Sequence, residues 1–200
     1  MITAVILAAG ESKRMGQPKM LLPWGSESVL THVISVFQNA GVSDIVIVTG
    51  GARAQVESLV SGLHVRTVHN KEYSNGEMLS SLQCGVKALT PPPLSRAERG
   101  AAMLIGLGDQ PQVQERSVRM VCEAFRESRS NLVIPSYQMR RGHPWLVARP
   151  LWDALLQMKS PLSPRDFINA HQAEVEYVTT DDSNILADLD TPEEYQKWRP

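Results

Sequence analysis

Cations and small residues crowd into one short segment near the start of the chain, which reads LAAGESKRMGQPK over residues 7–19. Small residues let a backbone approach a ligand closely, and Gly10 and Gly16 can adopt conformations closed to other residues. Successive N–H groups in such a turn form a concavity that binds anions. Arg14 adds a planar fork for phosphate oxygens, and Lys19 adds a point charge. The segment therefore predicts a phosphate-binding loop.

The spacing within this segment separates it from two common nucleotide-binding motifs. It does not fit G-x-x-x-x-G-K-[ST], which disfavours a P-loop kinase or ATPase, and it contains no G-x-G-x-x-G. A loop of glycine and lysine is often only a solvated turn. Here the loop directly follows an apolar run, and ligands of open α/β sheets bind beyond the carboxyl ends of strands. We therefore favour phosphate binding.

A carboxylate follows a second apolar run, where the chain reads LGDQP over residues 107–111. Asp109 stands next to a glycine and two residues before a proline, so we expect it in a crevice rather than in the core. Mg²⁺ prefers oxygen ligands and often binds one or two carboxylates together with substrate phosphates. A lone Asp in such a turn usually caps the next helix. With the phosphate loop in the same chain, we favour Asp109 as a Mg²⁺ ligand.

Two more carboxylates lie near the end of the chain, in the segment ADLDTPEE over residues 187–194. Thr191 is a suitable N-cap with Glu194 three residues later, so a helix is expected to begin here whatever the function. Asp188 and Asp190 are separated by one residue, and we expect only one of the two to face a site.

Three further segments carry candidate binding residues. The run RRGHP at 140–144 combines cations, a glycine and an imidazole, which suits an acidic acceptor, although a lone histidine is more often structural. Ser80 and Ser81 lie where a loop leads into an expected helix, so their hydroxyls serve either a nucleotide or simple capping. Thr49 and Gly50 end an apolar run and either border a base or form a tight turn.

The elements that must position these residues alternate between strands and helices. Apolar runs at 4–8, 45–48, 103–107 and 132–134 predict strands that are covered on both faces, as in a parallel sheet. Apolar stripes with helical spacing lie between them, beginning near residues 29, 56, 79 and 118. The pattern predicts a Rossmann-like α/β fold with helices on both faces of a mostly parallel, twisted sheet. The apolar run at 145–147 and the alternating segment at 175–178 predict additional antiparallel strands in the C-terminal part.

Composition narrows the range of functions. The 200 residues fit one domain, 1–200, and 42% of them are apolar, which suffices for a sizeable core. A formal net charge of −1 gives no general attraction for nucleic acid or membranes, and we expect neither partner.

The apolar run 2–9 is too short to span a membrane. Two cysteines without a C-x-x-C spacing favour reduced thiols and a cytoplasmic protein. The proline-rich segment 91–100 is expected to be a surface loop.

The motifs together carry a family resemblance that runs from Val5 to Tyr195. The segment 7–19 resembles the signature L-A-[AG]-G-x-S-x-R-M-G-x-x-K of the MobA-like nucleotidyltransferases. Ala9, the G-D-Q-P run and the G-H-P run are similar to the molybdenum cofactor cytidylyltransferase group, whereas guanylyltransferases show L-A-G-G. The resemblance implies a fold of the nucleotide-diphospho-sugar transferase type.

The resemblance also implies roles for individual residues. It implies that Lys19, Arg14 and Asp109 are catalytic. It also implies that Asp109 and Asp188 bind the metal, with Asp190 as the alternative to Asp188. The acceptor falls to Arg141, Gly142 and His143. Nucleotide binding falls to the following set: Leu7, Ala8, Ala9, Gly10, Ser12, Arg14, Lys19, Thr49, Gly50, Ser80, Ser81 and Gly108.

The expected reaction is Mg²⁺-dependent transfer of CMP from CTP to the phosphate of molybdopterin cofactor, with release of pyrophosphate. Two alternatives stay open. One is nucleotidyl transfer to another phosphorylated acceptor, such as a sugar phosphate, methylerythritol phosphate or a phospholactate. The other is a non-catalytic carrier of molybdenum cofactor. Small molecules are the expected ligands in each case, and a molybdenum hydroxylase is a candidate recipient of the cofactor.

Overall fold

The fold is built on one large sheet in a computed structural model that describes residues 1–75, 77–89 and 101–200. The strands lie in the order β10-β7-β9-β6-β1-β4-β5, and β8 pairs with β7. The expected loop at 91–100 lies outside the described residues. The strands are β1 (Ile2–Ala8), β4 (Ile45–Thr49), β5 (Arg66–His69), β6 (Ala102–Leu107), β7 (Leu132–Tyr137), β8 (Arg140–Arg141), β9 (Trp145–Ala148) and β10 (Val175–Thr179).

The pairing is mostly parallel, as expected. In the central strand β1, Val5 faces Val46 of β4 on one side and Ile105 of β6 on the other, and both pairs are parallel. β9 runs antiparallel between β6 and β7, and β8 runs antiparallel to β7. The expectation of antiparallel additions is therefore confirmed for β8 and β9. β10, however, is parallel to β7, because the helices after β9 return the chain to the end of the sheet at which β7 begins.

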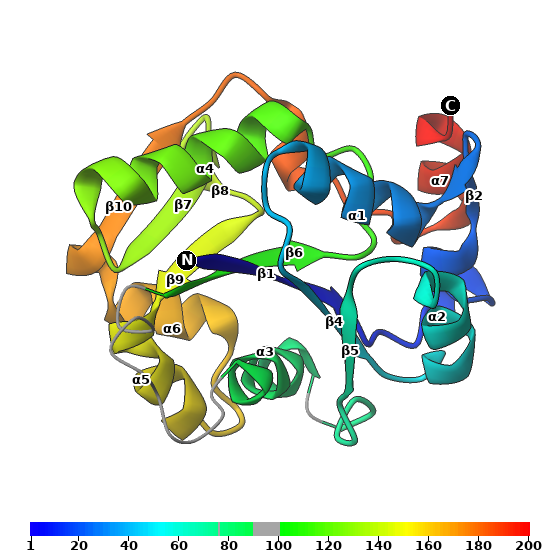
Figure 1. Cartoon of the computed structure of the whole chain (residues 1–200), viewed down its shortest axis with the longest axis horizontal. Helices are drawn as coiled ribbons and strands as arrows, with labels where there is room; N and C mark the ends of the chain where they lie inside the picture. The colour runs from blue at the N-terminus through cyan, green and yellow to red at the C-terminus, as the bar shows by residue number, and fades with distance from the viewer. Residues whose placement is uncertain (76, 90–100) are drawn as a thin grey trace.

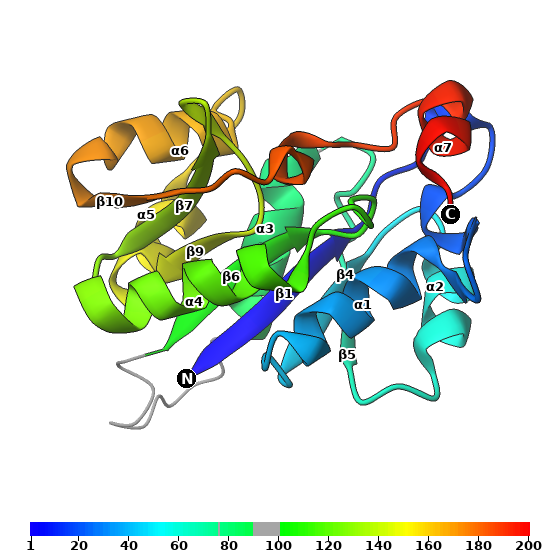
Figure 2. The same ribbon diagram turned by 90° about the horizontal axis from the view of Figure 1, so that it is seen from above.

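Helices cover both faces of the sheet, because successive strand residues point to opposite sides. Ala4 and Ile6 of β1 belong to one core with α1 (Val29–Asn39), α2 (Arg53–Val60) and α4 (Glu115–Ser128). Val5 and Leu7 belong to a second core with α3 (Glu77–Ala88), α5 (Trp152–Gln157) and α6 (Pro164–Ala170). Figures 1 and 2 show α1 and α4 on one side of the strands and α3, α5 and α6 on the other.

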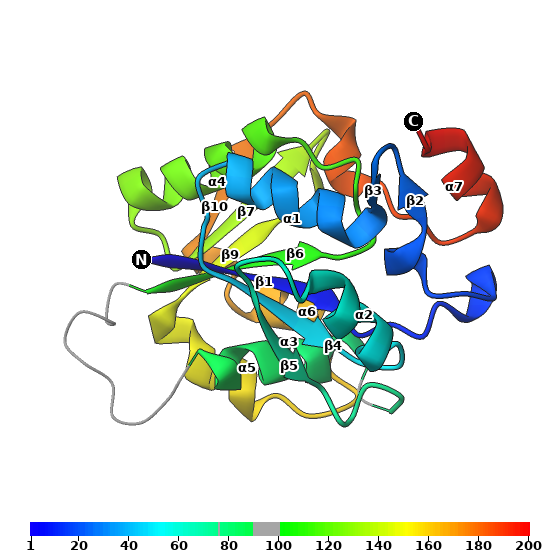
Figure 3. The ribbon, with the colours of Figure 1, turned by 45° about the vertical axis from the view of Figure 1, so that its right-hand side comes forward.

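A third, smaller apolar cluster joins the two ends of the chain. It contains Met15 from the phosphate loop, Trp24 from β2 (Pro23–Trp24), and Leu189 and Tyr195 from the C-terminal segment. The Tyr195 hydroxyl donates a hydrogen bond of 2.6 Å to the carbonyl of Pro23. Figure 3 accordingly shows α7 (Pro192–Trp198) beside β2 and the short strand β3 (Glu27–Ser28). This cluster holds the segment with Asp188 and Asp190 against the phosphate loop.

The helix at the C-terminus begins as expected. The Thr191 side chain accepts a hydrogen bond from the backbone N–H of Glu194, and the Glu194 carboxylate accepts from the N–H of Thr191. This reciprocal capping box fixes the start of α7.

Both cysteines are free. None of the helices in the described part of the chain is long and apolar enough to cross a membrane.

Candidate active site

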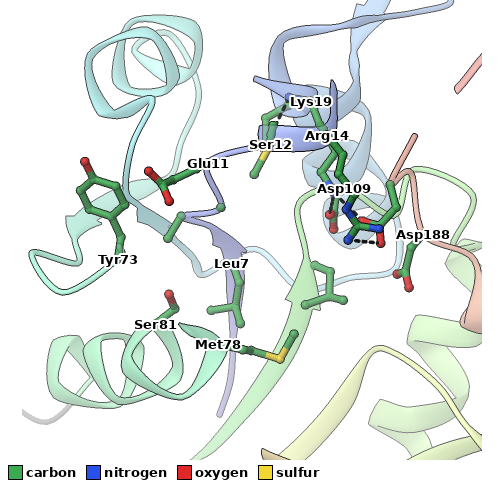
Figure 4. Close-up of a pocket in the computed structure, with 15 residues that line it drawn as sticks. Leu7, Glu11, Ser12, Arg14, Lys19, Tyr73, Met78, Ser81, Asp109 and Asp188 are labelled. Atoms are coloured by element: carbon green, nitrogen blue, oxygen red, sulfur yellow. Dashed lines mark hydrogen bonds and ion pairs between the residues drawn. The ribbon is translucent and has the colours of Figure 1, made fainter. Parts of the chain in front are cut away.

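A cavity of about 570 Å³ opens beyond the carboxyl ends of β1 and β6. Figure 4 shows it bounded by the phosphate loop, by α3, and by the segment that carries Asp188. Its lining contains both of the principal motifs singled out in the sequence, together with side chains that were not anticipated. The residues are Leu7, Ala9, Gly10, Glu11, Ser12, Arg14, Lys19, Met20, Tyr73, Met78, Ser81, Leu107, Asp109, Asp188 and Asp190.

The phosphate loop turns through two residues with left-handed backbone angles. Gly16 has φ +68°, as its residue type allows, whereas the second such position is Ser12, at φ +52°, and not Gly10 as we expected. The Ser12 hydroxyl accepts a hydrogen bond from the backbone N–H of Lys19 at 3.0 Å, which closes the loop. Gly10 contributes space instead, because an added Cβ there would meet no atom within 4 Å. A ligand can therefore approach its backbone.

Lys19 is the cationic centre of the site. Its ammonium lies 2.6 Å from an Asp109 carboxylate oxygen and 3.0 Å from an Asp190 oxygen, and its side chain is only 10% exposed. Burial acts to lower the pKa of Lys19, but attraction and hydrogen bonding to the two carboxylates outweigh it, so the pKa is raised. Lys19 is therefore a permanent positive charge at neutral pH.

Arg14 and Asp190 form a second ion pair at the mouth of the cavity. The Arg14 guanidinium donates to Asp190 at 2.9 Å. Partial burial acts to raise the pKa of Asp190, but Lys19 and Arg14 outweigh it, and the pKa falls below its ordinary value. Because Asp190 contacts both cations, it fixes their positions relative to each other.

Asp188 has a different environment. One of its carboxylate oxygens accepts a hydrogen bond of 2.7 Å from the Gln110 side chain. Burial raises the pKa of Asp188, and the negative charges of Asp109 and Asp190 raise it further. Together they outweigh the hydrogen bond from Gln110, which lowers it. Added positive charge at this carboxylate would therefore be stabilising.

The expectation that only one of Asp188 and Asp190 faces the site is wrong. Both line the cavity, while Leu189 between them is fully buried in the small apolar cluster. Residues two apart in an extended segment project to the same side. Leu189 therefore anchors the segment and turns both carboxylates toward the phosphate loop.

The donor set suits a magnesium ion that binds together with phosphate oxygens. No group of three His, Cys, Asp or Glu side chains gathers as a complete metal site among the described residues. Mg²⁺ does not require one, since it commonly takes one or two carboxylates plus substrate phosphates. Asp109 and Asp188 both line the cavity and have carboxylate oxygens of the kind that such a metal takes as ligands. The site therefore fits a metal that arrives with a nucleotide.

Comparison with known proteins places this geometry in a family. A family model described as the MobA-like NTP transferase domain matches residues 4–175. The chain belongs to the MobA-like NTP transferase family. The resemblance inferred from residues 7–19 is thereby confirmed, and the matched region contains the phosphate loop and Asp109.

Two relatives that match by sequence cover almost the whole chain, but their names imply different reactions. Molybdenum cofactor cytidylyltransferase of Escherichia coli K12 is 27% identical over 199 residues, which cover 97% of this chain and 93% of the relative. Nicotine blue oxidoreductase of Paenarthrobacter nicotinovorans is 30% identical over 202 residues, which cover 96% and 94%. Family membership alone therefore does not define the reaction.

Solved structures share this fold, and one of them contains a metal ion. The crystal structure of Rv0371c from Mycobacterium tuberculosis H37Rv aligns with a TM-score of 0.80 at 26% identity and covers 98% of this chain and 96% of that chain. A complex of Rv0371c with manganese aligns with a TM-score of 0.73 at 25% identity and the same coverage. That complex shows a divalent cation bound to a protein of this architecture.

Several residues expected to bind nucleotide do not line the cavity of this MobA-like domain. Thr49 is fully buried and its hydroxyl donates to the carbonyl of Val68 at 3.4 Å. Gly50 touches the phosphate loop from behind, since an added Cβ would lie 2.2 Å from the Ala9 carbonyl oxygen. Ser80 accepts a hydrogen bond from Asn70 and borders a separate hollow. Ala8 and Gly108 are also absent from the lining, whereas Ser81 is part of it.

The three expected acceptor residues also lie outside the cavity lining. Arg141 is turned toward α6 and β10, where its guanidinium donates to Asn169 at 2.7 Å and to the Tyr177 hydroxyl at 2.9 Å. Gly142 packs against Ile185 so closely that an added Cβ would lie 2.5 Å from the carbonyl oxygen of Ile185. His143 donates its backbone N–H to that same carbonyl at 3.0 Å. Gly142 and His143 therefore support the segment that leads to Asp188.

His143 is expected to make folding sensitive to acid. Its Nε2 is buried without a hydrogen-bond partner, and burial lowers the pKa of the imidazole from 6.5 to about 4. As the pH falls below 6.5, the His143 imidazole is protonated in the unfolded chain but stays neutral in the folded chain until about pH 4. The free energy of unfolding therefore decreases as the pH falls from 6.5 to about 4. The shift corresponds to about 3 kcal/mol.

Urea unfolding at pH 7 and pH 4.5 tests this expectation. The wild type should lose more unfolding free energy between the two pH values than His143→Gln, in which the residue at 143 cannot titrate. Other groups titrate equally in both proteins, so the difference isolates His143. Equal losses would show that the imidazole is as easily protonated in the folded state as in the unfolded one.

Sequence reasoning missed the part of the cavity remote from the cations. Glu11 is an unspecified position in the family signature, and Tyr73 and Met78 lie in or next to a loop without a recognisable pattern. Ser81 was singled out at this end. Gln110, the glutamine of the G-D-Q-P run, does not line the cavity but contacts Asp188.

Proposed function

We propose that this protein transfers CMP from CTP to the phosphate of molybdopterin cofactor, with Mg²⁺ and release of pyrophosphate. The observation that carries the proposal is the cluster in which Lys19, Asp109 and Asp190 meet at hydrogen-bonding distance in the cavity beside the phosphate loop. Such a cluster suits a reaction in which charge moves between phosphates. The choice of CTP and of molybdopterin rests on Ala9, on the G-D-Q-P and G-H-P runs, and on the full-length relative from Escherichia coli.

Nucleotidyl transfer asks mainly for positioning and charge neutralisation. An oxygen of the acceptor phosphate attacks the α-phosphorus of CTP, the bond between the α- and β-phosphates breaks, and the electron pair leaves with pyrophosphate. Lys19 and Arg14 offset the charge that develops on the leaving group. No general base is required because the attacking phosphate is already ionised.

Asp109 and Asp188 are the residues that would hold Mg²⁺. The metal, when bound, supplies Lewis-acid polarisation of the phosphates and charge neutralisation. Asp190 has another role, since it contacts Lys19 at 3.0 Å and Arg14 at 2.9 Å. We assign Asp190 to positioning the two cations. A molybdenum hydroxylase would be the recipient of the product.

Paired substitutions separate these two carboxylates. Asp188→Asn is expected to weaken Mn²⁺ binding in the presence of CTP by about tenfold or more, because a charged oxygen ligand is lost. Asp190→Asn is expected to leave Mn²⁺ affinity closer to that of the wild type and to lower the transfer rate through misplaced cations. Titration followed by the electron paramagnetic resonance of free Mn²⁺ measures the affinities. The reverse order of effects would make Asp190 the metal ligand.

Transfer of label from [α-³²P]CTP tests the choice of acceptor. Molybdopterin cofactor, a sugar phosphate, methylerythritol phosphate and phospholactate are supplied separately, each with Mg²⁺. The proposal expects labelled product with molybdopterin cofactor. Product with another acceptor would retain the nucleotidyl-transfer chemistry and overturn the assigned substrate. Cofactor binding without transfer would indicate a carrier.

A further inference from the structure

The two ends of the cavity differ in chemistry. One end holds Lys19, Arg14 and the three aspartates, and the other holds Glu11, Tyr73, Met78 and Ser81 (Figure 4). A nucleotide whose phosphates contact the cations must direct its base toward the second end, because the cavity is continuous between the two. That end therefore determines which base is accepted.

Glu11 and Tyr73 share one corner of this second end. An ideal Cβ placed on Gly51 would lie 3.3 Å from Cε2 of the Tyr73 ring and 3.5 Å from Cγ of Glu11. Both side chains therefore lie around one point, and Gly51 has no side chain to separate them. Figure 4 shows the Glu11 carboxylate directed toward the Tyr73 side of the cavity. The corner combines an aromatic face with a carboxylate.

We propose that Glu11 selects a pyrimidine with an exocyclic amino group, and thus CTP over UTP, at the corner that it forms with Tyr73. The proposal rests on the proposed function for the orientation of the nucleotide. An ionised carboxylate only accepts hydrogen bonds. Cytosine presents an amino donor where uracil presents a carbonyl oxygen, and Glu and Asp are suited to accept from that amino group.

The discrimination has an attractive and a repulsive part. The amino group of cytosine donates a charge-assisted hydrogen bond to Glu11, which is stronger than a neutral one. The carbonyl of uracil would instead bring its oxygen, an acceptor, against a carboxylate oxygen that also only accepts, and the two would repel each other. One well-placed contact of this kind separates two bases by about 10- to 100-fold in affinity.

Equilibrium binding of CTP and of UTP tests the proposal. Isothermal titration is done with Mg²⁺ and without any acceptor, so that no transfer occurs. The wild type is expected to bind CTP about 10- to 100-fold more tightly than UTP. In Glu11→Gln the ratio should approach one, because an amide can donate to the uracil carbonyl as well as accept from cytosine. Glu123→Gln, an exposed carboxylate on α4, serves as the matched control and should keep the wild-type ratio.

Each outcome bears on the proposal separately from the reaction. An unchanged ratio in Glu11→Gln, or a wild type that does not distinguish CTP from UTP, would overturn the role of Glu11. If the preference is lost in Glu11→Gln but the wild type releases no pyrophosphate from CTP with any acceptor, the role of Glu11 stands and the proposed function is rejected. Pyrophosphate release from CTP with an unchanged ratio would do the reverse.

Discussion

Asp109→Ala is expected to lower the rate of CMP transfer by about 1,000-fold or more. The change removes a proposed metal ligand and also the carboxylate that lies 2.6 Å from the Lys19 ammonium. Both losses act on the charge that moves during transfer, where metal stabilisation amounts to several kcal/mol. Steady-state turnover at saturating CTP, measured as pyrophosphate release, gives the magnitude.

Two comparisons make this result specific. Asp153→Ala removes an exposed aspartate on α5, and its turnover should equal that of the wild type. Asp109→Asn keeps the shape of the side chain while removing its charge, and should be nearly as inactive as Asp109→Ala if charge is what matters. Turnover within a few fold of the wild type in Asp109→Ala would exclude Asp109 from the metal site.

Lys19→Met is the second large effect that we expect. The substitution keeps an apolar stem of similar length at this buried position and removes the ammonium. Loss of one preorganised donor to a developing charge slows an enzyme by about 100- to 1,000-fold. Nucleotide affinity should change less, because Arg14 and the loop backbone still contact the phosphates. The turnover number is therefore expected to fall more than the affinity for CTP.

The control for this variant must also address folding, since Lys19 compensates two carboxylates. Removing one partner of a mostly buried pair leaves its partners uncompensated. Thermal unfolding of Lys19→Met and of Lys159→Met, an exposed lysine after α5, shows how much stability is lost. A folded Lys19→Met with a wild-type turnover number would remove Lys19 from the reacting centre.

The fold was largely predictable because its central strands are covered on both faces. The continuous apolar runs in β1, β4, β6 and β7 are a direct consequence of that burial. β5 escaped prediction because it lies at the edge of the sheet, where its residues are exposed or half-buried. α5 is only six residues long and α6 seven, too short for a helical period to be recognised.

The site was predictable where its residues are neighbours in sequence, and less so where the fold gathers them. The phosphate loop and Asp109 follow apolar strands, so their position beyond the carboxyl ends of those strands could be inferred. The corner formed by Glu11 and Tyr73 depends on the close approach of three loops, for which the sequence carries no spacing rule. Likewise, only the burial of Leu189 explains why both Asp188 and Asp190 face the cavity.

Arg141, Gly142 and His143, which the resemblance assigns to the acceptor, lie outside the cavity lining, and their role in acceptor binding stays a prediction. Arg141 is held by Asn169 and Tyr177, and Gly142 is required by contact with Ile185. The G-H-P run thus supports the wall of the site from behind. In this structure it acts through Ile185 and the segment beyond it, which leads to Asp188.

The measurement that tests the central claim most directly is pyrophosphate release with CTP, GTP, ATP and UTP, each with Mg²⁺ and molybdopterin cofactor. We predict release with CTP that depends on both the metal and the cofactor, and little release with UTP. Release with GTP in place of CTP would preserve the site and overturn the significance of Ala9. Absence of release with all four nucleotides, from a folded protein that binds the cofactor, would contradict the account.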